Sequence, residues 1–208
     1  MATFKTLPDD VVAYLQTKVG LSLPRTIDAL GLAETSKVTL NENVDVWQLP
    51  SNLVAEPSND LNLLAKPTGE WHLQVKSEDI PVAYARCGPL GFAPTDWSVD
   101  APTDQSVDAP TDWSVDGVFQ SDLAQKIDQA MAWIDSNFQN ENILVRLLVS
   151  PAYQLHAFWL IDQDEPSQQT IVIVDAPDEY LFQKPPQTYS PQQFLDSLRS
   201  VRHVEGIF

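Results

Sequence analysis

Three apolar runs in the second half of the chain limit its fold most strongly. They lie within 142–150, 155–161 and 170–174 and are rich in Val, Ile and Leu. Near-continuous apolar runs of this length are typical of central β-strands that are covered on both faces. Pro151 predicts a turn between the first two runs. We therefore expect three neighbouring strands that need other elements to cover them.

Two predicted helices, one before and one after these runs, can cover the strands. Ser121 can cap a helix that ends near Phe138, and Ser190 and Pro191 can open another. The apolar stripes of these two helices are Leu123, Ile127, Ala130, Met131, Ile134 and Phe138, and Phe194, Leu195, Leu198 and Val201. The second half therefore predicts the order helix, three strands, helix.

The first half predicts shorter elements. A helix over 11–19, capped by Asp9 or Asp10, is expected to stop at Gly20, and a second short helix is possible over 24–30. Period-two spacing then predicts strands on both sides of a turn at 41–43. Alternation over 70–76 and 80–87, with a polar turn between, predicts a β-hairpin.

These elements predict an α+β fold with a mixed or mainly antiparallel sheet and helices packed mainly on one face. We divide the chain into an N-terminal part (1–92), a tandem repeat (93–116) and a C-terminal part (117–208), most simply within one compact domain. A split into two domains at 91–116 is the alternative, because the composition changes there.

The repeat itself is an octapeptide, Ala-Pro-Thr-Asp-(Trp/Gln)-Ser-Val-Asp, present three times in tandem over 93–116. Near-identical adjacent copies indicate a loop insertion into a protein that already folded without it. Pro at the second position favours a turn in each copy. An irregular excursion is expected, although a small three-stranded meander is conceivable. The last copy continues into Gly117, Val118 and Phe119 and is interpreted as the original connection.

Charge excludes several classes of partner. The 208 residues carry 29 acidic and 12 basic side chains, a formal charge of −17, which repels nucleic-acid backbones and anionic membranes. No secretion signal and no 18-residue apolar span is evident, so a cytoplasmic protein is expected. The single cysteine, Cys87, excludes an internal disulfide and any multi-cysteine metal site. No cofactor is expected.

One pattern in the repeat has the form of a calcium loop. Asp112, Ser114, Asp116 and Gly117 match its opening positions. The position where a bidentate glutamate should close the coordination sphere is Leu123, so we interpret the match as coincidence and expect no metal.

Candidate catalytic groups are few, and none forms a recognisable catalytic motif. His72, His156 and His203 lack metal-ligand spacing, although Asp162 and Asp175 end strands near His156. The acids Asp175, Asp178 and Glu179 follow a buried strand, where a polar turn is the simpler explanation. Cys87 could face His72 across the hairpin, but a small apolar role near a strand end is favoured. We therefore expect no catalytic residue.

Aromatic rings beside acids in the repeat are the better candidates for binding. Trp97 and Trp113 are expected to be exposed, with Asp96 and Asp112 as charged neighbours. A large ring supplies contact area and an acid supplies electrostatic steering. The expected function is non-catalytic binding to a protein with a basic surface. Two alternatives remain: a hydrolase or transferase near His156 and Asp175, and an acidic nucleic-acid mimic or immunity-type protein.

Overall fold

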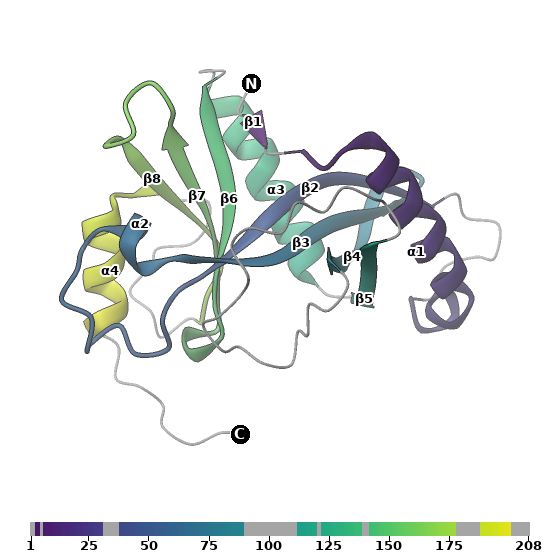
Figure 1. Ribbon diagram of the computed structural model, residues 1–208, viewed down its shortest axis with the longest axis horizontal. Helices are drawn as coiled ribbons and strands as arrows, with labels where there is room; N and C mark the ends of the chain where they lie inside the picture. The colour runs from purple at the N-terminus through teal and green to yellow at the C-terminus, as the bar shows by residue number, and fades with distance from the viewer. Residues whose placement is uncertain are drawn as a thin grey trace. The chain divides into compact units, whose positions relative to one another are not determined.

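A computed structural model describes residues 3–4, 6–30, 38–89, 112–119, 122–138, 142–177 and 188–200. The chain is an α+β protein with helices and a large mixed sheet (Figure 1). Its strands are β1 (Thr3–Phe4), β2 (Val38–Gln48), β3 (Lys66–Ser77), β4 (Ile80–Pro89), β5 (Trp113–Phe119), β6 (Ile143–Ser150), β7 (Leu155–Asp162), β8 (Gln169–Asp175) and β9 (Thr188–Tyr189). Its helices are α1 (Asp9–Leu30), α2 (Leu61–Leu64), α3 (Asp122–Asn137), the 3₁₀ turn η2 (Pro151–Tyr153) and α4 (Pro191–Ser200).

The chain divides into two compact units that are discontinuous in sequence. The first unit contains 1–3, 47–66 and 129–208, and the second contains 4–46 and 67–128. β2, β3 and α3 each begin in one unit and end in the other. The unit boundaries therefore fall inside secondary-structure elements and lie outside the repeat.

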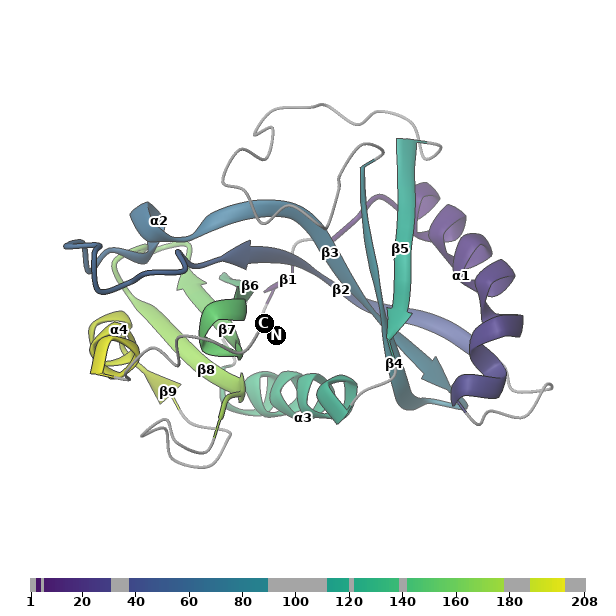
Figure 2. The ribbon, with the colours of Figure 1, turned by 90° about the horizontal axis from the view of Figure 1, so that it is seen from below.

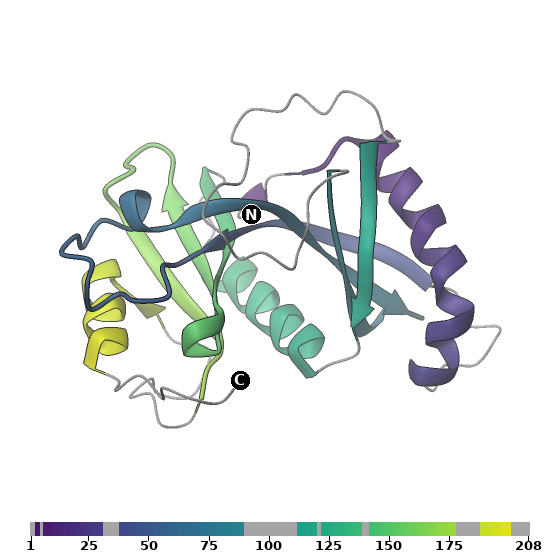
Figure 3. The ribbon, with the colours of Figure 1, turned by 60° about the horizontal axis from the view of Figure 1, so that its bottom comes forward.

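The second unit is built on the predicted hairpin, which is confirmed. β3 and β4 pair antiparallel, β5 pairs antiparallel with β4, and the strand order is β5-β4-β3-β2. Glu78 and Asp79 form the turn with φ of 52° and 67°, the left-handed conformation that favours the right-handed twist of a hairpin. α1 runs alongside β5 (Figures 2 and 3).

The core of the second unit joins one stripe of α1 to one face of β3 and β4. Val11, Leu15 and Val19 repeat at helical spacing and are buried. Full burial stabilises an apolar side chain of this size by about 1.5–3 kcal/mol. The other buried members of this core are Leu7, Leu40, Trp71, Leu73, Val75, Ala83, Ala85, Cys87 and Trp113.

The first unit contains the three predicted apolar strands, and their order is confirmed. β6, β7 and β8 pair antiparallel in sequence order, with β9 added at the edge of β8. η2 makes the turn at Pro151, and Gln154 completes it with a positive φ of 48°. α4 lies beside β8 and β9 (Figures 1 and 2).

The core of the first unit contains most of the largest buried side chains of the described chain. Trp159, Tyr153 and Phe194 are almost completely buried there. The remaining buried members are Leu49, Leu53, Leu61, Leu64, Ala65, Leu148, Leu155, Ala157, Ile161, Ile171, Ile173, Leu195 and Leu198. α4 enters this core through Phe194, Leu195 and Leu198, as predicted, whereas Val201, the fourth residue of the predicted stripe, lies outside the described residues.

Three expected elements differ from the structure. α1 does not stop at Gly20 but continues to Leu30, because one glycine weakens a helix by only about 1 kcal/mol. β2 has no turn at 41–43, and the Asn43 side chain instead accepts a hydrogen bond from the Leu7 amide at 3.2 Å. The last repeat copy is not irregular from Trp113 onward, because it pairs with β4. The other two copies, 93–108, lie outside the described residues.

Candidate functional site

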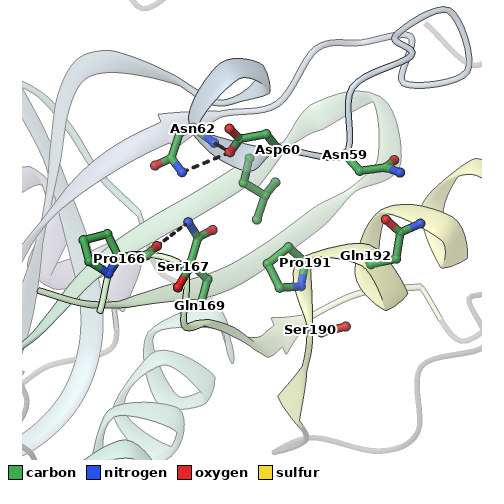
Figure 4. A pocket seen from close by; sticks show the side chains of 10 residues that line it. Asn59, Asp60, Asn62, Pro166, Ser167, Gln169, Ser190, Pro191 and Gln192 are labelled. Atoms are coloured by element: carbon green, nitrogen blue, oxygen red, sulfur yellow. Dashed lines mark hydrogen bonds between the residues drawn. The ribbon is translucent and has the colours of Figure 1, made fainter. Parts of the chain in front are cut away.

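A polar groove in the first unit is the candidate site. It has a volume of about 460 Å³, within the range of ligand-binding sites, and it is open to solvent (Figure 4). Three chain segments line it, at the start of α2, in the turn between β7 and β8, and at the start of α4. The lining residues are Asn59, Asp60, Leu61, Asn62, Pro166, Ser167, Gln169, Ser190, Pro191 and Gln192.

The first wall is set by the N-terminus of α2. Asp60 is the N-cap residue, and its Oδ1 accepts hydrogen bonds from the Asn62 backbone N–H at 2.9 Å and from Asn62 Nδ2 at 3.0 Å. An aspartate at this position satisfies a backbone donor that the helix leaves unpaired. The cap therefore holds the Asp60 and Asn62 side chains together at the groove (Figure 4).

Arg199 of α4 holds the loop that leads into this wall. Its guanidinium donates hydrogen bonds to the carbonyl oxygens of Leu53, at 3.2 Å, and Glu56, at 2.9 Å. It also donates to the Ser58 carbonyl and to Asn59 Oδ1. Because its planar donors are spread over several acceptors, one arginine orders the whole loop. Arg199 thereby positions Asn59 at the groove.

The second wall is the turn after β7. Asp162 Oδ1 accepts from the backbone N–H groups of Asp164, at 2.9 Å, and Glu165, at 3.2 Å, which closes the turn. Gln169 then bridges the wall to the core: its Nε2 donates to the Pro166 carbonyl at 3.0 Å and its Oε1 accepts from Trp159 Nε1 at 3.1 Å. The buried indole thus fixes the orientation of a groove side chain.

The third wall is the capped start of α4. Ser190 and Gln193 form a reciprocal capping box: Ser190 Oγ accepts from the Gln193 N–H at 3.3 Å, and Gln193 Oε1 accepts from the Ser190 N–H at 3.1 Å. Pro191 occupies the first helical position, where its missing N–H costs nothing. Gln192 Nε2 donates to Asp196 Oδ2 at 2.7 Å. This wall therefore has a defined backbone and side-chain geometry.

The lining chemistry suits hydrogen bonding and excludes several kinds of ligand. Among the described residues that line the groove, amide and hydroxyl groups dominate, Asp60 is the one charged residue, and none is aromatic or basic. A site without a basic group does not neutralise phosphates, and a site without a ring offers no stacking surface for a base or sugar. The groove suits a neutral or cationic ligand.

A second polar cluster is buried in the second unit. Arg86 binds the Glu70 carboxylate through two hydrogen bonds, Nε to Oε1 at 2.6 Å and Nη2 to Oε2 at 2.8 Å. His72 Nε2 lies 2.7 Å from Glu70 Oε1, and the His72 ring stacks on Tyr84 with 4.9 Å between ring centroids. The side chains of Glu70 and His72 are each 7% exposed. The fork geometry of arginine matches the carboxylate at both oxygens.

The ionisation of this cluster follows from burial and pairing. Burial alone would raise the pKa of Glu70, but hydrogen bonds and charges from His72 and Arg86 outweigh it and lower that pKa. Burial raises the pKa of Tyr84, so its phenol stays neutral. We interpret this cluster as structural, because its carboxylate is committed to two partners.

The predicted binding residues have different outcomes. Trp113 is 7% exposed and packs in the core of the second unit, so the expectation of an exposed ring is wrong. The reason is that its strand pairs with β4, with Trp113 opposite Pro89. Asp112, its predicted charged neighbour, is exposed. Trp97 and Asp96 lie outside the described residues.

The residues that were considered for catalysis also have different outcomes. His72 pairs in register with Arg86, while Cys87 pairs with Trp71, so the suggested His72 and Cys87 contact is wrong. Cys87 is buried, its Sγ lies 3.7 Å from the Trp71 carbonyl, and burial raises the pKa of its thiol. His156 and Asp175 do lie opposite each other on β7 and β8. Asp178, Glu179 and His203 lie outside the described residues.

The calcium-like pattern lies in an extended strand. From Ser114 to Gly117 it belongs to β5, and the Ser114 hydroxyl donates to the Gly88 carbonyl at 3.4 Å. A calcium loop needs a tight turn that brings its oxygens around one ion, whereas this segment runs extended in β5. Within the described residues, no group of three or more His, Cys, Asp or Glu side chains is arranged to hold a metal.

The sequence reasoning missed the groove residues. Two local signals pointed to its walls: the Asp60 cap before a Leu-rich turn, and the Ser-x-x-Gln capping box at Ser190. Neither signal says that α2, the β7–β8 turn and α4 come together. Only tertiary packing of the first unit assembles the three segments.

Comparison with known proteins identifies no relative. No family model matches the chain, and neither the curated proteins nor the solved structures contain a significant match. No helix in the described ranges is both long enough and apolar enough to cross a bilayer.

Proposed function

We propose that this protein acts without catalysis, by binding a partner protein that presents a basic surface. The main support is that acidic and basic side chains differ in exposure within the described residues. Acidic side chains remain at the surface, whereas most basic side chains are engaged within the fold. Within the described residues, the exposed side chains are therefore more acidic than the composition alone implies.

The basic residues are engaged in three ways. Arg86 and Lys76 pair with the carboxylates of Glu70 and Asp128. The Arg146 guanidinium lies over the Trp47 ring, 3.9 Å from its centroid, and 5.1 Å from that of Trp159. Arg199 binds the loop carbonyls described above. Lys126 pairs with Asp122. Lys18 and Lys66 are the exposed ones among the basic residues whose burial is described, and Lys18 Nζ lies 5.2 Å from the centroid of the Tyr14 ring.

The acidic residues show the opposite distribution. Most of those whose burial is described are exposed: Asp9, Asp10, Glu56, Asp60, Glu78, Asp79, Asp112, Asp116, Asp122, Asp135, Asp164, Glu165 and Asp196. A surface of one sign raises the encounter rate with a partner of the opposite sign and repels partners of the same sign. This supports a basic protein as the partner and disfavours nucleic acid.

The proposal is tested by capturing the partner and measuring its association rate. Full-length protein is immobilised, exposed to native cell extract, and eluted with a salt gradient. The purified pair is then studied by stopped-flow at about 0.01 to 0.5 M NaCl. The association rate should fall by tenfold or more as salt rises, with a smaller change in dissociation. A partner without a basic surface, or a salt-independent association rate, would refute the proposal.

Two alternatives have distinct outcomes in related experiments. If the captured protein is a nucleic-acid-binding protein that DNA or RNA displaces, the mimic or immunity-type function replaces the proposal. An enzyme using His156 and Asp175 is favoured only by their register on β7 and β8. In a screen of nitrophenyl ester and phosphate substrates, that enzyme should lose turnover with Asp175→Ala while keeping its fold, and absence of turnover in the wild type removes this alternative.

A further inference from the structure

We propose that the groove of the first unit is the docking site for an extended segment of the partner, and that Asp60 binds an arginine or lysine side chain of that segment. This inference rests on the proposed function and adds the place and chemistry of recognition. It follows from the charges, the hydrogen-bonding groups and the shape of the groove.

The charges at the groove favour a cation. Asp60 uses Oδ1 to cap α2, and the described residues provide no partner for its Oδ2. Acids also flank the other two walls, each with its own partner: Glu165 precedes Pro166 and accepts from Gln168, and Asp196 accepts from Gln192. Among the described bases, Arg199 pairs with Asp196 at 3.9 Å, and its other donors are committed to the loop carbonyls and to Asn59. Among the described residues, a cationic side chain therefore meets Asp60 without a competing free base.

The N-terminus of α4 does not change the preference of the groove for a cation. A helix N-terminus usually attracts anions through its free N–H groups. Here Pro191 has no N–H, and Ser190 Oγ already accepts the hydrogen bond of the Gln193 N–H. The helix therefore offers few donors to an anion at the groove.

The neutral groups at the groove match a polypeptide backbone. Asn62 donates to Asp60 through Nδ2, which leaves its carbonyl oxygen to accept, and Asn59 accepts from Arg199, which leaves its amide to donate. Gln192 likewise donates to Asp196 and retains its carbonyl oxygen. An extended backbone uses both acceptors and donors, because each residue carries one N–H and one C=O.

Apolar atoms also line the groove. Pro166 and Pro191 are both lining residues. Interfaces combine an apolar contact with a polar surround, and the two proline rings supply that contact for a neighbouring partner residue. A peptide segment with one basic and one apolar side chain fits this arrangement, whereas a small polyamine would leave the amides and the prolines unused.

The test uses two peptides that differ in charge alone. Acetyl-Gln-Leu-Arg-Ala-Gln-amide and the same peptide with citrulline in place of arginine are titrated into ¹⁵N-labelled full-length protein. Amide shifts are expected at 59–62, 167–169 and 192. Because exposed ion pairs contribute modestly, the citrulline peptide should bind about two- to fivefold more weakly. Equal affinity for the two peptides, or shifts confined to the second unit, would overturn the inference.

Matched variants separate the groove from general acidity. Asp60→Asn removes the charge but keeps the helix cap, since asparagine and aspartate cap equally well. Asp79→Asn removes the same charge from an exposed turn of the second unit, where asparagine tolerates the positive φ. Asp60→Asn should abolish the preference for arginine, and Asp79→Asn should leave it intact. Equal effects of the two variants would overturn the inference.

The inference and the proposed function can fail separately. If the groove variants bind the captured partner normally while its association stays salt-dependent, the docking site is wrong and the proposed function stands. If no partner with a basic surface is captured, the proposed function fails, whatever the peptides do. Spermidine displacing the arginine peptide from the groove at equal concentration would show binding of any small cation and would also overturn the inference.

Discussion

Replacing Glu70 with glutamine tests how the second unit is held together. The variant leaves the Arg86 guanidinium without its buried counter-charge, while the glutamine oxygen still accepts one hydrogen bond. Removing one partner of a buried ion pair costs about 3–5 kcal/mol. Because the Arg86 side chain is 19% exposed and Asp116 also stabilises its charge, we expect the lower end, about 3 kcal/mol.

The assay is amide hydrogen exchange in β3 and β4. A loss of about 3 kcal/mol corresponds to exchange that is roughly a hundredfold faster. Local exchange is preferable to a global melt, since a chain with two compact units need not unfold in one step. Glu56→Gln is the control: Glu56 is exposed, and its change should stay within about 0.5 kcal/mol.

The pH dependence gives the sign of the effect. The pKa of Glu70 is lowered in the fold from its ordinary value of 4.5, so the folded state favours the ionised form. Its contribution is complete above pH 4.5 and is lost as the pH falls through the lowered folded value. The difference between wild type and Glu70→Gln should therefore be largest at neutral pH and shrink in acid.

A double variant separates charge from packing. Glu70→Leu combined with Arg86→Met removes both charges, and replacing a buried pair by apolar groups is often neutral or stabilising. We expect the double variant to recover most of the loss seen with Glu70→Gln. A single-variant loss below about 1 kcal/mol, or a loss that is the same at pH 7 and pH 3, would refute the reasoning.

Four further predictions follow from burial and contacts. Cys87 should resist alkylation at pH 8 until urea is added, because burial raises the pKa of its thiol, and prompt labelling of the folded protein would contradict this. Trp159→Ala should destabilise the first unit by about 3–5 kcal/mol in urea titrations, whereas Trp133→Ala, half-buried on α3, should cost less. Arg199→Met should lower the protection of the Leu53 amide measured by hydrogen exchange, since it frees the 53–59 loop, with no change expected in β4. Deleting 93–108 should shift Tm by only a few degrees in calorimetry, and outright unfolding would disprove the insertion hypothesis.

Helices and strands were predicted well where the apolar residues followed a single regular spacing. The hairpin of β3 and β4, the stripes of α3 and α4, and the runs of β6, β7 and β8 were all expected from spacing alone. Prediction failed at 41–43, because the turn residues there are also compatible with an extended strand once Asn43 bonds to Leu7. It also failed at Trp113, whose burial depends on pairing with β4 and not on the polarity of its neighbours.

The sequence by itself determined the class of the fold, the excess of acid and the capping signals of the helices, because these depend on residue type and short-range spacing. Tertiary structure alone decided which charges remain exposed, since Arg86, Arg146 and Arg199 are engaged by residues distant in the chain. It likewise decided that Asp60, Gln169 and Gln192 line one groove. The physical reason is that long-range packing, which short-range spacing does not encode, brings separate segments together.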